Sequence, residues 1–140
     1  MTKQSAEYII QNGMVVTGNL EFDVIQTGAV VIDQGKIAAV GDMDLLKSWQ
    51  AAETIDAKGC IVMPGLVNAH THLPMSLFRG LADDLPLMTW LNDYIFPAES
   101  AHVNPETVRI GALLSCAELL LSGTTTCCDG YFHEDTVAEA

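Results

Sequence analysis

The chain has 140 residues, 49% of them hydrophobic and 17% charged, a composition that indicates a globular domain with a real core and excludes a disordered or fibrous chain. Its 6 Lys and Arg residues against 18 Asp and Glu residues give a formal net charge of −12 at pH 7. That charge repels phosphate backbones and anionic lipids, so nucleic acids and membrane surfaces are disfavoured as partners.

Residues 1–63 are predicted to form a small antiparallel β module, the amino-terminal part of a β-sandwich domain. Three hairpins are expected, each with a turn signal between two apolar runs: residues 8–10 with 14–16, 29–32 with 36–40, and 54–56 with 60–63. Asn12-Gly13 marks the first turn and Gly35 the second, because these residue types accept positive φ. Asp42 or Asp44 is expected to cap a short helix that follows.

Residues 64–140 alternate between strands and helices. The expected elements are a strand at 66–69, a helix at 87–95, a helix at 105–121, a strand at 124–128 and a helix that begins near 134. Asn104 and Pro105 are a strong start signal for the second helix, and Gly123 is expected to end it. This order predicts an α/β fold, the start of a (β/α)8 barrel of the TIM type with parallel strands.

The motif His70-Thr71-His72 directly follows the first predicted barrel strand. Residues i and i+2 of a strand point to the same face, so both imidazoles are expected to converge at the carboxyl end of the strand. Barrels of this type place their active sites at that end, and two neutral imidazoles can supply half of a zinc shell. The spacing alone is a weak signal, because it also fits two ordinary polar residues at a strand end.

The sequence around the two histidines makes the signal specific. The run PGLVNAHTH at residues 64–72, preceded by DAKG at 56–59, resembles the amidohydrolase superfamily. The similarity continues through LPMSLFRGLADD at 73–84 and FPAE at 96–99, and this pattern resembles the methylthioadenosine/S-adenosylhomocysteine deaminase branch, a relative of the chlorotriazine hydrolases. The resemblance covers nearly the whole chain and implies a metal-dependent hydrolase barrel beside a composite β-sandwich domain.

This resemblance implies that His70 and His72 are two ligands of one catalytic zinc ion, with Fe2+ as the alternative metal. In the family the metal activates water for attack on the purine carbon that carries the amino group, and ammonia leaves. The resemblance also implies that Glu99 binds the ribose hydroxyls of a nucleoside such as methylthioadenosine or S-adenosylhomocysteine, because a carboxylate can accept two hydroxyl hydrogen bonds. The alternative for Glu99 is an ordinary solvated glutamate.

Two further residues near the motif have two interpretations each. Trp90 is expected either to line the nucleoside pocket or to pack with Leu91 and Tyr94 against the barrel. The first alternative makes it a candidate substrate-binding residue. Arg79 is expected to brace the Asp83-Asp84 pair rather than to steer an anionic part of a substrate.

The remaining polar residues of the second half are expected to be structural. Asp129 and His133 follow the second barrel strand and should cap or terminate elements, and His102 should be exposed. The cysteines lack metal or disulfide spacing and are expected to be buried free thiols in a reducing cytoplasm: Cys60, Cys116, Cys127 and Cys128. No targeting signal or bilayer-spanning apolar run is visible.

The resemblance also implies that a third histidine, the general base and an Asp near the metal come from later barrel strands, so no catalytic residue is assigned within this segment. A complete barrel takes about 250 residues, and we expect this chain to be an inactive fragment of a longer enzyme or to be completed by another polypeptide. Two rival functions remain: an amidohydrolase of another heteroaromatic amine or halide, such as a guanine-like or triazine ring, and a non-catalytic binding or assembly module. The exact substrate, the metal and the oligomeric state, a homo-oligomer included, stay open.

Overall fold

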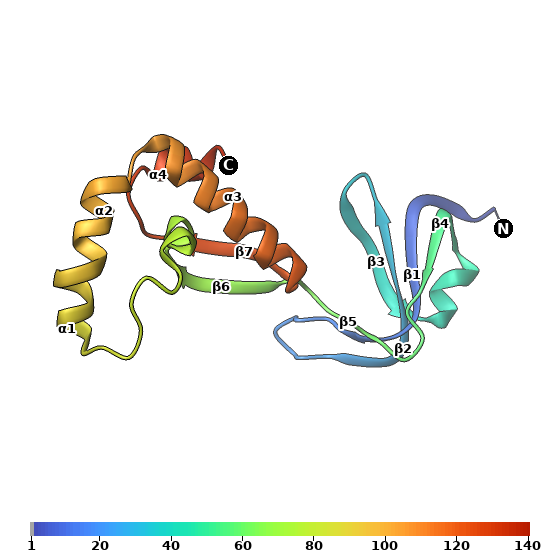
Figure 1. The fold of residues 1–140 in the computed structure, drawn as a ribbon. Helices are drawn as coiled ribbons and strands as arrows, with labels where there is room; N and C mark the ends of the chain where they lie inside the picture. Colours follow the sequence, from blue (N-terminus) through green and yellow to red (C-terminus); the bar gives the residue numbers. More distant parts are fainter. Residues whose placement is uncertain (1) are drawn as a thin grey trace. The chain divides into compact units, whose positions relative to one another are not determined.

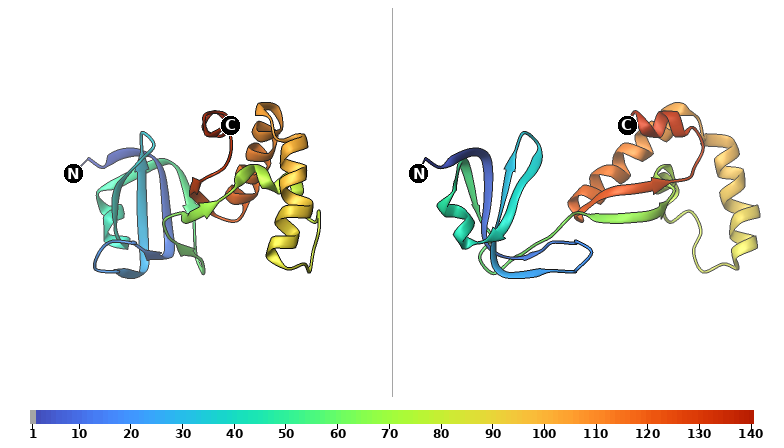
Figure 2. Two further views of the ribbon diagram at one scale, coloured as in Figure 1. Left: turned by 90° about the vertical axis from the view of Figure 1, so that its left-hand side faces the viewer. Right: turned by 180° about the vertical axis from the view of Figure 1, so that it is seen from behind.

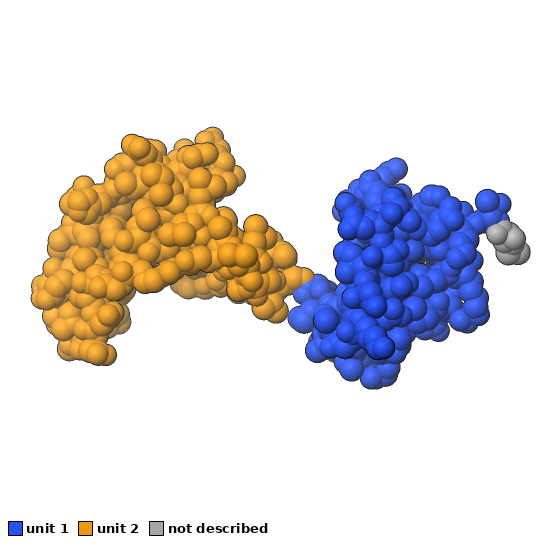
Figure 3. Space-filling model, turned by 45° about the vertical axis from the view of Figure 1, so that its right-hand side comes forward, with its two compact units in different colours: residues 1–64 blue, residues 65–140 orange. Residues whose placement is uncertain are grey.

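The computed structural model describes residues 2–140, and the chain divides between Pro64 and Gly65 into two compact units (Figure 3). We call Met1–Pro64 unit 1 and Gly65–Ala140 unit 2. The boundary lies within the Pro-Gly pair at which the sequence pattern changes from hairpins to alternating strands and helices. Among residues 2–140 no helix is long and apolar enough to cross a membrane.

Unit 1 is built on a five-stranded sheet in the order β3-β2-β1-β4, with the short β5 also paired to β1 (Figures 1 and 2). The strands are β1 (Gln4–Val16), β2 (Val24–Asp33), β3 (Lys36–Asp42), β4 (Trp49–Asp56) and β5 (Ile61–Val62), and a 3-10 helix, η1 (Met43–Lys47), connects β3 to β4. Ala6, Ile9 and Val31 are buried at the centre of its core, and Leu45, Leu46 and Trp49 pack against them.

The β2–β3 hairpin and the cap of η1 confirm the sequence prediction. The strands pair antiparallel up to Asp33 and Lys36, and Gln34 (φ 51°) and Gly35 (φ 69°) form the turn. Two positive φ angles are what a two-residue hairpin turn requires. The Asp42 side chain accepts a hydrogen bond of 2.9 Å from the Asp44 amide and so caps the first turn of η1.

The hairpin predicted at Asn12-Gly13 is wrong, because β1 runs straight through this pair. The pairing register of β1 with β2 shifts on both sides of Gly13, so the pair forms a β-bulge rather than a turn. Asn12 has the positive φ of 66° that suggested a turn, and its Nδ2 donates to Asp56 Oδ1 at 2.8 Å. A Cβ on Gly13 would lie 2.8 Å from the Val62 side chain, so glycine is needed for close packing there.

The third predicted hairpin is also wrong. β4 and β5 do not pair with each other, and both lie parallel to β1, β4 along its first part and β5 at Met14 and Val15. The loop between them detours around the β1 bulge, with the Ala57 amide donating to Gln11 O at 2.8 Å and the Met14 amide donating to Cys60 O at 3.0 Å. Unit 1 is therefore a mixed sheet rather than an antiparallel one, and its membership of a β-sandwich stays a prediction.

Unit 2 opens with two parallel strands, as predicted, and α3 covers one face of this small sheet (Figures 1 and 2). Its elements are β6 (Leu66–Thr71), the 3-10 helix η2 (Leu73–Phe78), α1 (Leu87–Trp90), the π-helical turn η3 (Leu91–Ile95), α2 (Phe96–His102), α3 (Pro105–Leu121), β7 (Thr124–Asp129) and α4 (Glu134–Ala138). The predicted helix at 87–95 thus continues to His102. Asn104 caps α3 as expected, because its Oδ1 accepts from the Glu106 and Thr107 amides at 3.1 Å.

The first residues after His72 pack directly on α3. A Cβ on Gly111 of α3 would come within 2.7 Å of the Pro74 carbonyl oxygen, and Ser76 Oγ donates to Gly111 O at 3.1 Å. Ser115 Oγ donates to Leu73 O at 2.6 Å. This contact fixes the path of the chain as it leaves β6.

Because this contact is so close, Gly111→Ala is expected to lower the free energy of unfolding by about 1–3 kcal/mol through overpacking. Alanine favours an isolated helix over glycine by about 1 kcal/mol. A lower stability of the variant would therefore indicate overpacking, and a higher stability would indicate helix propensity. Urea unfolding of both proteins measures it. Gly41→Ala is the matched control, since its added Cβ would meet Leu45 no closer than 3.8 Å. A Gly111→Ala protein as stable as the parent would contradict the packing described here.

Two side-chain predictions are corrected by the structure. Arg79 forms a bidentate ion pair with Glu118 of α3, with Nη1–Oε1 at 3.0 Å and Nη2–Oε2 at 2.7 Å, instead of bracing Asp83-Asp84. The packing of η2 on α3 brings this distant carboxylate into reach. All four cysteines are free, as expected, but Cys60 and Cys128 are exposed and the other two are half-buried rather than buried.

Candidate active site

His70 lies in β6, and His72 follows the strand as the residue before η2. Both are exposed, and their ring centroids lie 5.0 Å apart with an angle of 73° between the ring planes. Strand alternation explains why the two rings share one side of the chain. The structure thus brings the two histidines together, and their role as metal ligands stays a prediction.

The donor chemistry of this pair fits part of a zinc site. Neutral imidazole is a common zinc ligand, and a catalytic zinc ion takes three protein ligands and an open position. Within residues 2–140, no group of three His, Cys, Asp or Glu side chains lies close enough together to hold a metal ion. The positions of His70 and His72 would allow them to provide half of a four-coordinate shell.

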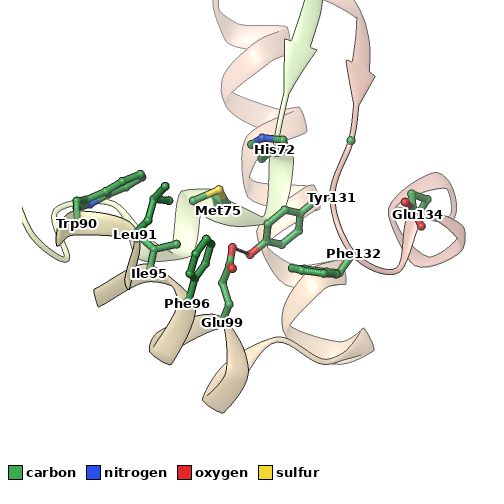
Figure 4. A pocket seen from close by; sticks show the side chains of 11 residues that line it. His72, Met75, Trp90, Leu91, Ile95, Phe96, Glu99, Tyr131, Phe132 and Glu134 are labelled. Atoms are coloured by element: carbon green, nitrogen blue, oxygen red, sulfur yellow. Dashed lines mark hydrogen bonds between the residues drawn. The ribbon is translucent and has the colours of Figure 1, made fainter. Parts of the chain in front are cut away.

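His72 also lines a cavity of about 500 Å³ (Figure 4). This volume lies within the range of about 300–1,000 Å³ that is usual for small-molecule sites. Three of the four predicted site residues, His72, Trp90 and Glu99, line it together. The rest of the wall is mostly apolar and includes Met75, Leu91, Ile95, Phe96, Tyr131 and Phe132.

Glu99 lies in α2, and its carboxylate points toward Tyr131 in the cavity (Figure 4). Tyr131 Oη donates a hydrogen bond of 2.6 Å to Glu99 Oε1. Tyr131 is only 8% exposed, and its ring centroid lies 5.8 Å from that of His72. Burial, and then the hydrogen bond to Glu99, raise the pKa of the Tyr131 phenol well above its usual range, so the phenol stays a neutral donor. Glu99 is a half-buried, hydrogen-bonded residue and not a freely solvated one.

Trp90 ends α1 and stands half-buried at the cavity wall, as does its neighbour Leu91. Tyr94, which the packing interpretation also placed in the interior, is 42% exposed. Ile95, at 2% exposure, is the residue that anchors this helical run. The position of Trp90 allows contact with a bound molecule, and that contact stays a prediction.

Asp129 has the capping role predicted for it. Its Oδ1 accepts a hydrogen bond of 2.6 Å from the Leu73 amide at the start of η2, while Oδ2 is buried without a hydrogen-bond partner in the described part of the chain. His133 is at the N-cap position of α4, as the expected structural role requires, with φ 57° and without a capping hydrogen bond from its side chain. His102 is exposed, as expected.

Sequence reasoning missed most of the cavity wall. Tyr131 lies two residues after Asp129, just beyond the carboxyl end of β7. Its position directly after a predicted barrel strand was the sequence signal that could have identified it as a site residue. Met75 and Phe96 lie in the insertion between β6 and α3. Their presence at one cavity depends on how the insertion folds back over the strand ends, and no local pattern encodes that fold.

Comparisons with known proteins bear on the family of the chain and on its fold. The model of the amidohydrolase family matches residues 61–140. A 5-methylthioadenosine/S-adenosylhomocysteine deaminase of Syntrophobacter fumaroxidans is 51% identical over 141 residues, which cover 100% of this chain and 32% of that protein. An adenosine deaminase from Xanthomonas campestris, solved with bound zinc, matches with a TM-score of 0.92 and 41% identity over 99% of this chain and 32% of that one. An atrazine chlorohydrolase from Arthrobacter aurescens TC1, complexed with zinc, matches with a TM-score of 0.78 and 25% identity over 94% and 32% of the respective chains.

The chain spans about a third of the length of these relatives. Its mixed α/β unit 2 corresponds to the start of the barrel of the amidohydrolase structures. The family resemblance predicted from the sequence, including the deaminase branch and its chlorotriazine hydrolase relatives, is confirmed. Because the family match covers more than half of its residues, the chain belongs to the amidohydrolase family.

Proposed function

We propose that this chain supplies the amino-terminal part of the active site of a zinc-dependent deaminase of adenosine-type nucleosides, such as 5'-methylthioadenosine and S-adenosylhomocysteine. The reaction takes up water, replaces the exocyclic amino group of the purine by an oxo group and releases ammonia. One observation carries the proposal: His72, beside His70, and Glu99 line the same cavity. A metal donor pair and an acceptor for sugar hydroxyls in one apolar pocket suit a nucleoside hydrolase.

His70 and His72 would hold the metal at the carboxyl end of β6. When bound, zinc supplies Lewis acidity and activates water for attack at neutral pH. Fe2+ is the alternative, because imidazole ligates both metals. The zinc bound in the relatives from Xanthomonas campestris and Arthrobacter aurescens favours zinc.

The other cavity residues would bind and orient the nucleoside. Glu99 would accept hydrogen bonds from the ribose hydroxyls, since a carboxylate has about four acceptor sites and Tyr131 occupies one of them. Trp90 and Phe96 offer apolar and aromatic surface to a flat, neutral purine.

The chain needs further barrel strands for this activity. β6 and β7 form a two-stranded sheet, and apolar side chains beside it are strongly exposed: Val67 at 68%, Leu120 at 66% and Leu121 at 90%. We infer that further strands and helices cover these residues and bring the third histidine, the general base and the metal-side Asp. We call this chain, together with the polypeptide that completes its barrel, the complete enzyme.

The rival substrates are other heteroaromatic amines or halides, such as guanine-like or triazine rings. Identity of 51% and 41% to the two adenosine-type deaminases, against 25% to the atrazine chlorohydrolase, favours the nucleoside. The second rival is a non-catalytic binding or assembly module. It predicts no turnover of any of these compounds by the complete enzyme.

The test is a hydrolysis assay of the complete enzyme with 5'-methylthioadenosine, S-adenosylhomocysteine, adenosine, guanine and a chlorotriazine, each with and without a chelator. Ammonia release reports turnover of the four amines, and chloride release reports turnover of the chlorotriazine. We expect ammonia release from the adenosine nucleosides, its loss with the chelator, and its return when zinc is added back. Turnover of the triazine or guanine alone would support the first rival. Failure to turn over any of the five would support the module.

We also propose a cytoplasmic location. The four cysteines are free, and two of them, Cys60 and Cys128, are exposed in this chain. Exposed free thiols persist in a reducing compartment and tend to be oxidised outside it. The small-molecule substrate is the proposed partner, and the net charge of −12 argues against a nucleic acid.

A further inference from the structure

We propose that Tyr131 is a positioning residue that fixes the Glu99 carboxylate and so sets the preference of the site for substrates with ribose hydroxyls. The inference rests on the proposed function and adds to it the residue that holds the sugar acceptor in place. It starts from the 2.6 Å hydrogen bond between Tyr131 Oη and Glu99 Oε1.

The two partners come from parts of unit 2 that are far apart in sequence. Glu99 lies in α2, within the long insertion between β6 and α3. Tyr131 follows β7, and the amide of the preceding Gly130 donates to Thr71 O of β6 at 3.1 Å. The hydrogen bond therefore connects the helical insertion to the carboxyl ends of β6 and β7, where the two histidines lie.

The surroundings of Tyr131 hold its hydroxyl in place. The residue is 8% exposed, and its ring lies between those of His72 and Phe132, with centroids 5.8 Å and 5.0 Å away. Such a ring has little rotational freedom, so its hydroxyl presents one donor in one direction. Glu99, in contrast, has three side-chain torsions and would sample several rotamers without this donor.

The consequence is a pre-oriented acceptor for the sugar. Holding Glu99 before the substrate arrives removes the ordering penalty that binding would otherwise include. The benefit applies only to substrates with hydroxyls for Glu99 to bind. Tyr131 should therefore affect ribonucleosides and leave dideoxynucleosides unaffected.

The experiment compares Tyr131→Phe with the parent in the zinc-loaded complete enzyme, on a ribonucleoside substrate and on its 2',3'-dideoxy analogue. Loss of a hydrogen bond to a charged group corresponds to a factor of about 10 to 100, and we expect kcat/KM for the ribonucleoside to fall by that factor, mainly through KM. The dideoxy analogue should stay within about twofold of the parent. Tyr94→Phe, an exposed tyrosine in the same insertion, is the matched control and should change neither value.

Three outcomes would overturn the inference: no change with either substrate, an equal loss with both, or a loss that persists when Glu99 is already Ala. The double variant Glu99→Ala/Tyr131→Phe tests the last of these, because without the carboxylate the phenol has nothing to position. The double variant also remains usable if Tyr131→Phe alone is unstable, because it removes the Glu99 carboxylate that the single variant leaves without its donor. A parent enzyme that deaminates no adenosine nucleoside would instead refute the proposed function, so the two failures are distinguishable.

Discussion

His70→Ala and His72→Ala are each expected to remove zinc from the complete enzyme and to lower kcat/KM by at least about 1,000-fold. Replacing a residue that only hydrogen-bonds to a metal ligand already reduces metal affinity or activity by about 10- to 100-fold. Loss of a ligand itself should have a larger effect, because it leaves the coordination shell incomplete and the metal weakly bound. The two rings lie 5.0 Å apart at the carboxyl end of β6, so both variants should have the same effect. Metal content per chain and steady-state kinetics measure it.

His102→Ala provides the control for this prediction. His102 is exposed at the end of α2, outside the cavity, and only its backbone oxygen is used by the cap of α3. This variant should keep zinc and activity. If His70→Ala and His72→Ala both retained one zinc ion per chain, the histidine pair would not be the metal site, and the proposed function would lose its basis.

Glu99→Ala is expected to lower kcat/KM for an adenosine-type nucleoside by about 100- to 1,000-fold, because two charge-assisted hydrogen bonds to the ribose are lost. A ribose-free base such as 9-methyladenine should lose far less. The ratio of the two kcat/KM values in parent and variant measures the selectivity. Glu106→Ala, an exposed acid in the first turn of α3, controls for the change in charge and should leave the ratio unchanged.

An equal loss with both substrates would show that Glu99 holds the site together rather than binding sugar. That result would favour an amidohydrolase of another heteroaromatic ring. It would leave the metal prediction intact, because His70 and His72 are tested separately.

Features that depend on neighbours in sequence were determined by the sequence alone. The capping of α3 by Asn104, the turn at Gln34-Gly35 and the convergence of His70 and His72 each follow from the conformation of a few consecutive residues. Their energies are local: a capping hydrogen bond, a glycine with positive φ, and the two-residue period of a strand. The family resemblance rests on the same kind of contiguous motif.

Features that depend on which distant segments meet were decided only by the tertiary structure. Asn12 has the backbone conformation of a turn residue, yet β2, β4 and β5 all pair with β1 and make it a bulge. Arg79 reaches Glu118 rather than its nearer acids, and Glu99 meets Tyr131, because α3 and the insertion pack back over the strand ends. Hydrophobic burial is non-directional, so a local pattern specifies that a face is buried without specifying which partner covers it. That is why the sequence could identify the histidine pair, while the tyrosine that holds Glu99 became visible only in the folded chain.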